Sequence, residues 1–189
     1  DEVKKAWEEK SPRTVSIIKM DVSDADNLTE TETKKKSNID KALEKESFAD
    51  VAKAFSEDSN TANKNGFAGY VDSNSTSSDS SSTSTVPADV VTAAIGLKKG
   101  ETSDWITVTS SSGTSLYKVY VKETNSKKIF NAKSDTVSNQ ALYAILNSDS
   151  SLSYKILDSY AKKLDIKFND KDTKKIFDSY VKTTYGGDQ

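Results

Sequence analysis

One stretch constrains the fold more than any other, the residues SFADVAKAFSEDSNTANKNGFAGYV at positions 47–71. Its apolar residues recur at the spacing of one helix face: Phe48, Val51, Ala52 and Phe55. Ser47 can cap this helix, and a polar turn that contains Asp58 follows it. The stretch ends in a short hydrophobic strand with two glycines. It therefore predicts a helix, a turn and a strand in direct succession, against which much of the remaining chain can pack.

Helices and strands alternate through the first two thirds of the chain. Helices are predicted over residues 1–10, 29–45, 47–55 and 87–96, and strands over 15–20, 66–71, 104–109 and 116–122. Thr29 and Glu32 form a capping box, and Ser11-Pro12 ends the first helix. The order of these elements predicts an α+β fold in which helices cover a four-stranded, mainly antiparallel sheet.

The domain boundaries follow from changes in composition. Residues 12–124 are expected to form one α+β domain, interrupted by a serine-rich segment at 72–85 that has no apolar residue to bury and is predicted to be a mobile surface loop. Residues 1–11 and 125–189 are predicted to form a helical segment, in which C-terminal helices, one with an apolar stripe over 152–160, pack with the N-terminal helix around Trp7. A short alternating run at 164–168 reads as a strand or an extended link. Because the chain starts inside what looks like a helix, it is expected to be a fragment.

The amino-acid composition excludes several kinds of site. The sequence contains no cysteine and no histidine, which rules out disulfides, thiolate metal sites, cysteine nucleophiles and every triad that needs imidazole. The net charge of -2 gives no basic surface for nucleic acid. Acidic clusters at 21–26 and 165–172 lack the spacing of a calcium loop. We therefore predict no metal, no cofactor and no nucleic-acid partner.

Four stretches, in this order, resemble the parvulin family of peptidyl-prolyl isomerases. They are SFADVAKAFSEDS, NGFAGYV, VPADVVTAAIGLKKGETSDWI and GTSLYKVYV, and they begin at residues 47, 65, 86 and 113. The later run YAKKLDIKFNDKDTKKIF, at 160–177, is similar to the end of the extracytoplasmic PrsA foldases of Gram-positive bacteria. The resemblance spans nearly all of the chain, and it implies a parvulin-like domain joined to a helical chaperone part.

The resemblance implies candidate catalytic residues and also marks where this chain departs from the family. Asp58 occupies the position of the acid or cysteine of parvulins, whereas Ser16 and Ser115 stand where active members carry two histidines. The two serines are expected to face each other on neighbouring central strands, either in a reduced hydrogen-bond network with Asp58 or as a pair that only satisfies itself. Asp is also common in turns and at helix ends, so a structural role stays open for Asp58.

Four apolar or aromatic residues are the implied substrate-binding groups: Phe67 and Tyr70 on the glycine strand, and Val90 and Ile95 on the short helix. The two helix residues are smaller than those that usually form the proline pocket of the family, and Phe67 stands where an acid is common. With both histidines replaced as well, the resemblance favours an isomerase fold with weak or lost isomerase activity.

Two hypotheses of function follow from the resemblance. The first is an extracytoplasmic foldase or holdase that binds unfolded or proline-containing secreted polypeptides. It would be a lipoprotein on the cell membrane of a Gram-positive bacterium, held there only through an anchor outside this chain. The second is an active peptidyl-prolyl cis-trans isomerase with a serine-substituted site. A surface adhesin or scaffold that reuses the fold is a third reading, and a homodimer is left open.

Overall fold

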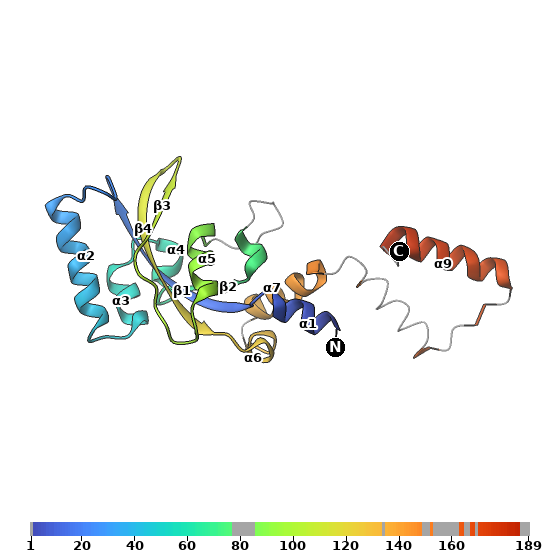
Figure 1. The fold of residues 1–189 in the computed structure, drawn as a ribbon. Coiled ribbons are helices and arrows are strands. Elements are labelled where there is room, and N and C mark those ends of the chain that lie inside the picture. Colours follow the sequence, from blue (N-terminus) through green and yellow to red (C-terminus); the bar gives the residue numbers. More distant parts are fainter. Residues whose placement is uncertain are drawn as a thin grey trace. The chain divides into compact units, whose positions relative to one another are not determined.

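The computed structural model describes residues 2–76, 86–133, 135–148, 152, 163–164, 167–168 and 170–185 (Figure 1). The chain divides into two compact units, Lys10–Ala141 and a second unit formed by Asp1–Glu9 with Leu142–Gln189. The division falls within helix α7 (Asp135–Ser148). Residues 10, 11 and 125–141 therefore belong to the first unit, although they were predicted to be part of the helical segment.

The first unit is built on a four-stranded sheet in the order β2-β1-β4-β3. Its strands are β1 (Arg13–Val22), β2 (Phe67–Val71), β3 (Ile106–Ser110) and β4 (Gly113–Glu123). All three strand pairings are antiparallel, and β1 and β4 occupy the centre. The predicted α+β fold is thus confirmed, and both central strands extend beyond the hydrophobic runs that predicted them.

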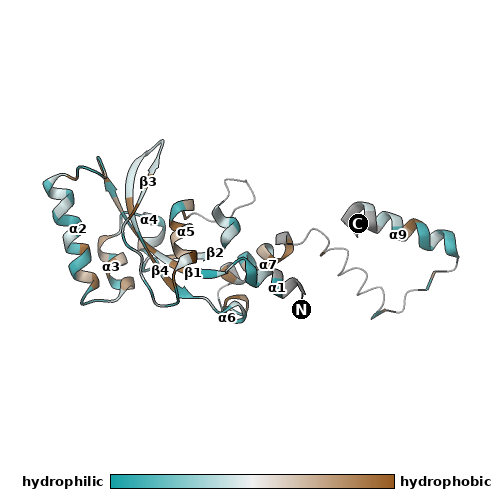
Figure 2. Ribbon diagram, viewed as in Figure 1, coloured by the Kyte–Doolittle hydropathy of each residue, from teal (hydrophilic) through white to brown (hydrophobic). Residues whose placement is uncertain are grey.

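The helices of this unit begin largely where side chains can cap them. They are α2 (Glu30–Leu43), α3 (Phe48–Phe55), α4 (Ser59–Ala62), α5 (Ala88–Gly96) and α6 (Ser126–Phe130), with a 3-10 helix η1 (Ser73–Thr76). The hydroxyl of Thr29 accepts the N–H of Glu32 at 3.3 Å, and the Glu32 carboxylate accepts the N–H of Thr29 at 2.7 Å, which completes the predicted capping box. Ser47 caps α3 by accepting the N–H of Asp50 at 3.2 Å. Figure 2 shows α2 as mostly hydrophilic, and Ile39 is its one buried residue.

Side chains alternate along β1 and β4 and give the sheet two apolar faces. On the first, called the α5 face, residues of the central strands pack with α5: Val15, Ile17, Val119 and Val121 with Val90, Val91 and Ala94. On the second, called the α3 face, they pack with α2 and α3: Ile18, Met20 and Leu116 with Ile39, Phe48, Val51 and Ala52. Each face carries its own core, so a polar residue on β1 or β4 belongs to one face or the other.

Arg13, the only arginine of the sequence, joins β1 to the end of α5. Its guanidinium donates hydrogen bonds to the backbone oxygens of Ala94 at 2.8 Å, Ile95 at 2.6 Å, Leu97 at 3.3 Å and Ser11 at 2.9 Å. The last carbonyls of a helix have no partner within the helix and lie at the negative end of its dipole. A half-buried cation at this position therefore satisfies several groups at once and fixes α5 against the sheet.

The start of the serine-rich segment is ordered, contrary to the prediction of a mobile loop over 72–85. Asp72 is only 3% exposed, and its carboxylate accepts hydrogen bonds from the Tyr70 hydroxyl at 2.7 Å and from the N–H groups of Asn74 and Ser75 at 2.9 Å and 3.1 Å. These bonds close η1, which contacts α5. Residues 77–85 lie outside the described part of the chain.

The second unit contains α1 (Glu2–Glu9), the end of α7, and α9 (Lys171–Tyr185). Trp7 on α1 is 2% exposed. Most of the predicted stripe over 152–160, and part of the run at 164–168, lie outside the described residues. Among the helices that are described, none is long and apolar enough to cross a membrane.

Candidate functional site

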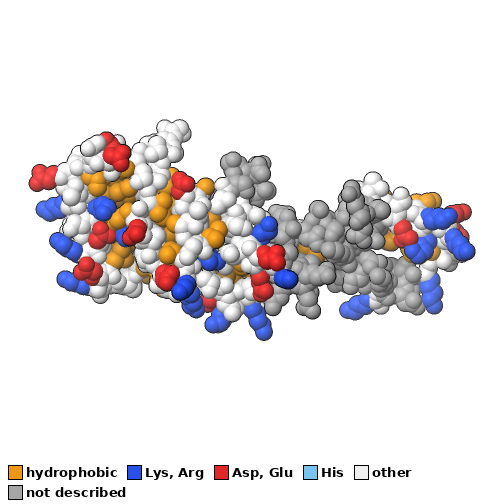
Figure 3. Space-filling model, in the orientation of Figure 1, with side chains coloured by type: hydrophobic (Ala, Val, Ile, Leu, Met, Phe, Trp, Pro, Cys, Tyr) orange, Lys and Arg blue, Asp and Glu red, His pale blue; other side chains and the backbone are white. Residues whose placement is uncertain are grey.

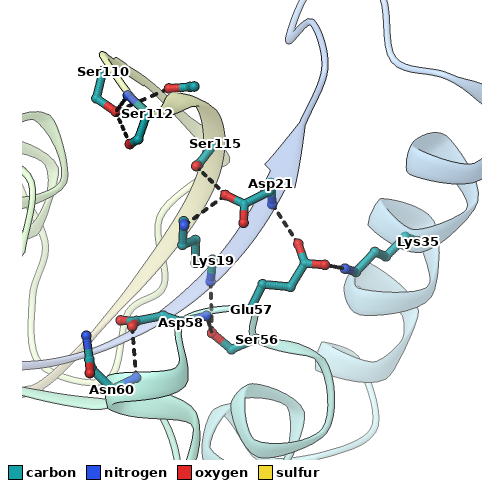
Figure 4. A network of polar contacts seen from close by, with 11 residues as sticks. Lys19, Asp21, Lys35, Ser56, Glu57, Asp58, Asn60, Ser110, Ser112 and Ser115 are labelled. Carbon is teal, nitrogen blue, oxygen red and sulfur yellow. Dashed lines mark hydrogen bonds and ion pairs between the residues drawn. The ribbon is translucent and has the colours of Figure 1, made fainter.

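Asp58 is the N-cap residue of helix α4, on the loop that follows α3 (Figure 4). Its carboxylate accepts hydrogen bonds from the N–H of Asn60 at 3.1 Å and from the hydroxyl of Thr61 at 2.9 Å. Its own N–H donates to Ser56 Oγ at 3.4 Å, and the same oxygen accepts the N–H of Lys19 at 3.1 Å. The structure therefore places Asp58 as a helix cap, and a catalytic role for it stays a prediction.

Ser16 and Ser115 do not face each other, which corrects the expected geometry. In the register of β1 and β4, Ser16 lies opposite Tyr120, and Ser115 lies opposite Asp21. Because successive side chains of a strand point to opposite faces, Ser16 shares the α3 face with Ile18, whereas Ser115 lies on the α5 face. Ser115 donates instead to the Asp21 carboxylate at 2.6 Å. The two serines therefore cannot form one network beside Asp58.

Lys19 and Tyr117 are the residues that the register brings together near Asp58. They lie opposite each other on β1 and β4, and the negative charge of Asp58 acts on both. The Lys19 ammonium forms an ion pair with Asp21 at 2.8 Å, through the oxygen that also accepts the Ser115 hydroxyl (Figure 4). We call Lys19, Asp21, Ser115 and Tyr117, together with Glu57 described below, the Lys19 cluster.

Lys19 and Tyr117 were not predicted from the sequence, because the family's histidine positions were matched residue by residue to Ser16 and Ser115. Lys19 lies three residues after Ser16, and an odd shift along a strand moves a side chain to the other face. Tyr117 lies two residues after Ser115 and keeps the same face. The available signal was the alternation of buried and polar residues along β1, which requires that Lys19 and Asp21 share a face.

The electrostatics of the cluster favour a charged Lys19 and a charged Asp21. The hydrogen bond to Asp21 raises the pKa of Lys19, although burial opposes the rise. Burial alone would raise the pKa of Asp21, but hydrogen bonds from Lys19 and Ser115 outweigh it and lower the pKa. Burial also raises the pKa of the Tyr117 phenol, against the lowering effect of Lys19. At neutral pH the cluster thus holds an ion pair and a protonated phenol.

Glu57 extends the cluster to helix α2 (Figure 4). Its carboxylate accepts the N–H of Asp21 at 2.7 Å and pairs with Lys35, and its own N–H donates to the Lys19 carbonyl at 2.9 Å. Three carboxylates, counting Asp58, therefore stand against two ammonium groups. Each of these charged groups already has a partner within the cluster or in the α4 turn, which leaves little unmet hydrogen-bonding capacity.

Burial separates the four predicted substrate-binding residues. Val90 is fully buried in the core of the α5 face, and Tyr70 is 5% exposed with its hydroxyl on Asp72, so the structure does not support a substrate contact for either. Ile95 is half-buried against the same core, and Phe67 is half-buried with the Lys122 ammonium 5.1 Å from its ring centre. Substrate binding by Ile95 and Phe67 stays a prediction.

The chemistry of the cluster is limited to hydrogen bonding and charge. It offers an ammonium, a phenol, a serine hydroxyl and carboxylates, and the sequence supplies no imidazole or thiol. Within the described ranges, no group of three or more acidic side chains is arranged to hold a metal ion. Such groups can orient a bound peptide or hydrogen-bond to its amides.

A comparison with family models decides the family. Residues 17–121, more than half of the chain, match the Rotamase family, described as the PPIC-type PPIase domain. The chain belongs to the PPIC-type PPIase family. The matched range runs from β1 to β4 and includes Lys19, Asp58 and Tyr117. The resemblance to parvulin isomerases is thus confirmed for this part of the chain.

Solved structures similar to this chain include three PrsA proteins. The foldase PrsA of Streptococcus pneumoniae is 25% identical with a TM-score of 0.45, and the match covers 93% of this chain and 58% of that one. The peptidylprolyl isomerase PrsA of Bacillus anthracis is 24% identical with a TM-score of 0.37, covering 89% and 70%. The foldase PrsA of Lactococcus lactis is 23% identical with a TM-score of 0.36, covering 98% and 59%. The chain thus spans less than two thirds of the streptococcal and lactococcal proteins, and no curated protein matches it.

Proposed function

We propose that this chain is part of an extracytoplasmic foldase of the PrsA type, which binds unfolded secreted polypeptides through its parvulin-like domain and has weak or lost prolyl isomerase activity. Membership of a peptidyl-prolyl isomerase family supports a polypeptide as the ligand. The observation that supports the loss of activity is that the side chains of Asp58 and Lys19 already have partners within the domain. The Asp58 carboxylate caps α4, and the Lys19 ammonium is paired with Asp21.

The chemistry of the reaction explains why these partners matter. Rotation about a peptide bond has a barrier of ~18–20 kcal/mol, and lowering it needs no nucleophile. It needs a pocket that holds the proline ring and free groups that bind the twisted amide better than the planar one. Val90 is buried in the core and Asp58 is engaged in the α4 turn, so both requirements are poorly met on the α5 face.

An active isomerase with a substituted site is the second candidate, and Tyr117 is the observation that favours it. Its phenol is half-buried and lies opposite Lys19, within the electrostatic reach of Asp58. A protonated phenol can donate a hydrogen bond to a peptide carbonyl or to a twisted amide. On this reading Tyr117, and not Ser16 or Ser115, would be the main hydrogen-bond donor.

A proline-peptide isomerisation assay on the whole chain separates the two candidates. We expect little acceleration over the uncatalysed rate, and no change in that rate in the variants Asp58→Ala and Tyr117→Phe. Robust turnover that is lost in either variant would overturn the proposed loss of activity. Ser16→Ala is the matched control, because Ser16 lies on the other face of the sheet and should leave any turnover unchanged.

Suppression of the aggregation of an unfolded client tests the foldase part of the proposal. The wild-type chain is expected to delay aggregation, and Phe67→Asn to weaken the delay, because Phe67 is a half-buried ring on an edge strand. Thr107→Asn, on the opposite edge strand, is the control. A chain that leaves aggregation unchanged at excess concentration would argue against a foldase.

The location and assembly belong to the same proposal. A lipoprotein anchor would lie in sequence outside this chain, so a signal peptide and a lipid-modified cysteine encoded before Asp1 would support it. An open reading frame that encodes neither would remove the lipoprotein anchor from the proposal. Measurement of the mass in solution decides whether the chain forms a homodimer.

A further inference from the structure

A cleft lies on the α3 face, on the opposite side of the sheet from the Lys19 cluster. It has a volume of about 380 Å³ and lies between the end of α2, the start of α3, β4 and the segment before β3. The cleft is open to solvent, and its lining is more polar than apolar. Nothing in the family match or in the motifs of the chain assigns a role to it.

Two stacked aromatic rings form part of the cleft lining. Phe48 and Tyr120 have ring centres 5.3 Å apart and an interplanar angle of 23°. Phe48 is 8% exposed and Tyr120 is half-buried, so the pair is held in place by the core of the α3 face. The faces of such rings attract cations as well as apolar groups. Figure 3 shows hydrophobic side chains open to the surface over this unit, with acidic and basic side chains among them.

The cleft already binds one ammonium group of the chain itself. The Lys118 ammonium donates to the Ser103 carbonyl at 3.2 Å, lies 3.6 Å from the Asp40 carboxylate and 5.2 Å from the ring centre of Trp105. Asp40 also accepts the indole N–H of Trp105 at 2.9 Å. A carbonyl, a carboxylate and an aromatic face thus combine to hold a cation at this end of the cleft.

Two carboxylates of the cleft remain without such a partner. Glu44 and Asp104 are exposed, and in the described part of the chain neither side chain enters an ion pair or a hydrogen bond. Glu44 is moreover the C-cap residue of α2, at the negative end of the helix dipole, where a carboxylate is unfavourable. Asp40 pairs with both Lys118 at 3.6 Å and Lys36 at 3.8 Å. Asp40, Glu44 and Asp104 thus stand against two ammonium groups, which leaves a net negative charge beside the aromatic pair, and the two carboxylates without a partner are those of Glu44 and Asp104.

We propose that this cleft is a second polypeptide-binding site, which takes a basic side chain, lysine or arginine, of an extended client. The cation would lie between Glu44 and Asp104, while its aliphatic stem and a neighbouring apolar residue would contact the half-buried ring of Tyr120, which stacks on the buried Phe48. The inference rests on the proposed function only in taking a polypeptide as the ligand. The aggregation assay tests the foldase, whereas direct peptide binding tests the cleft, so the two can fail separately.

A titration with two peptides tests the charge requirement. The probes are Ac-Gly-Leu-Arg-Leu-Gly-NH2 and the same peptide with citrulline, an uncharged analogue of arginine, in place of the arginine. The readout is the NMR spectrum of the isotope-labelled whole chain, in particular the indole N–H of Trp105, assigned with a Trp7→Phe variant. We expect the arginine peptide to shift Trp105 and backbone signals around the cleft, and to bind about tenfold more tightly than the citrulline peptide. Equal binding of the two peptides, or no shift with either, would overturn the proposal.

A matched pair of double variants tests the position of the site. Glu44→Gln with Asp104→Asn should weaken the arginine peptide about tenfold and abolish its advantage over citrulline. Glu46→Gln with Asp26→Asn removes the same charge from exposed positions outside the cleft and should leave the affinity within about twofold. Glu44→Gln alone should also leave the fold at least as stable as the wild type, because it removes a negative charge from the negative end of the α2 dipole. Shifts of the cleft signals that grow with protein concentration in the absence of peptide would identify a second copy as the occupant and overturn the inference.

Discussion

The two faces of the sheet share the central strands β1 and β4, but they differ in whether their polar side chains have hydrogen-bond or ion-pair partners. On the α5 face, Lys19, Asp21 and Ser115 satisfy one another, and Glu57 joins them to α2. On the α3 face, Glu44 and Asp104 remain unengaged in the described part of the chain beside an open cleft. The polar groups of the α5 face thus form a closed ionic network, whereas the opposite face keeps two carboxylates without a partner among the described residues.

The largest effect should come from a glycine that supports the α3 face. Gly66 has a φ of +78°, and a Cβ there would lie 2.6 Å from the Ala52 Cβ and 2.8 Å from the Ile17 carbonyl oxygen. Gly66→Ala should lower the free energy of unfolding by about 3 kcal/mol or more, since a left-handed backbone costs about 1–2 kcal/mol and overpacking about 1–3 kcal/mol more. Urea denaturation measures the loss. The same variant should broaden the NMR signals of the cleft before those of α5.

Gly96→Ala is the control for this prediction. Gly96 ends α5, has no positive φ, and would place a Cβ with nothing within 4 Å. Alanine should be neutral or stabilising there by up to about 1 kcal/mol, because glycine loses more backbone entropy on folding. Equal losses for the two glycine variants would contradict the argument from close approach at Gly66.

The next effect should come from the α5 face. Arg13→Met removes the hydrogen bonds to the end of α5 and should cost about 2 kcal/mol, because bonds from a charged donor contribute ~1.5–3 kcal/mol. Arg13→Lys should restore only part of the stability, since an ammonium cannot reproduce the planar fork. Hydrogen exchange should accelerate in α5 more than in α3. Lys98→Met removes an equal charge from an exposed neighbour and should change stability by less than about 0.5 kcal/mol.

Local structure was predictable from the sequence because local groups decide it. The Thr29–Glu32 box and the Ser47 cap mark the starts of α2 and α3, and the order of apolar runs gave the antiparallel sheet. The cap role of Asp58 was open on the same grounds. For a helix cap, the capping residue and the two or three residues after it determine the local structure.

The site was less predictable because it depends on strand register. A motif match does not determine which residue of β4 lies opposite a given residue of β1, and an error of one or three residues exchanges the faces. Ser16 was therefore placed with Ser115, although they lie on opposite sides. Asp72 was not predicted to be buried, because its donors are neutral groups close to it in the sequence, the Tyr70 hydroxyl at the end of β2 and N–H groups of the following turn, and the sequence there looks like a polar loop.

A smaller effect on stability is expected when the Lys19–Asp21 ion pair of the α5 face is removed. Lys19→Met should raise the pKa of Asp21, and it should cost no more than about 1 kcal/mol at neutral pH, because the pair is partly exposed. The pKa of Asp21 is lowered in the folded state, so its contribution is present above its ordinary value of 3.8 and is lost as the pH falls through the folded value. The difference in unfolding free energy between wild type and variant should therefore shrink in strong acid. A difference that persists unchanged would show that Lys19 acts through packing.

The smallest effect compares two carboxylates whose pKa values fall to about 2 for different reasons. Glu32 reaches this value through hydrogen bonds from the backbone N–H groups of Thr29 and Ser23, whereas Glu123 reaches it first through its hydrogen bond from Lys99 at 2.7 Å. Salt screens an exposed ion pair but not a backbone dipole at contact distance. Carboxyl NMR titrations at low and high salt should therefore show the pKa of Glu123 rising with salt while that of Glu32 stays nearly constant. Lys99→Met should raise the pKa of Glu123 alone, and Thr29→Ala that of Glu32 alone. Both contributions to stability are present above the ordinary value of 4.5 and are lost as the pH falls through about 2.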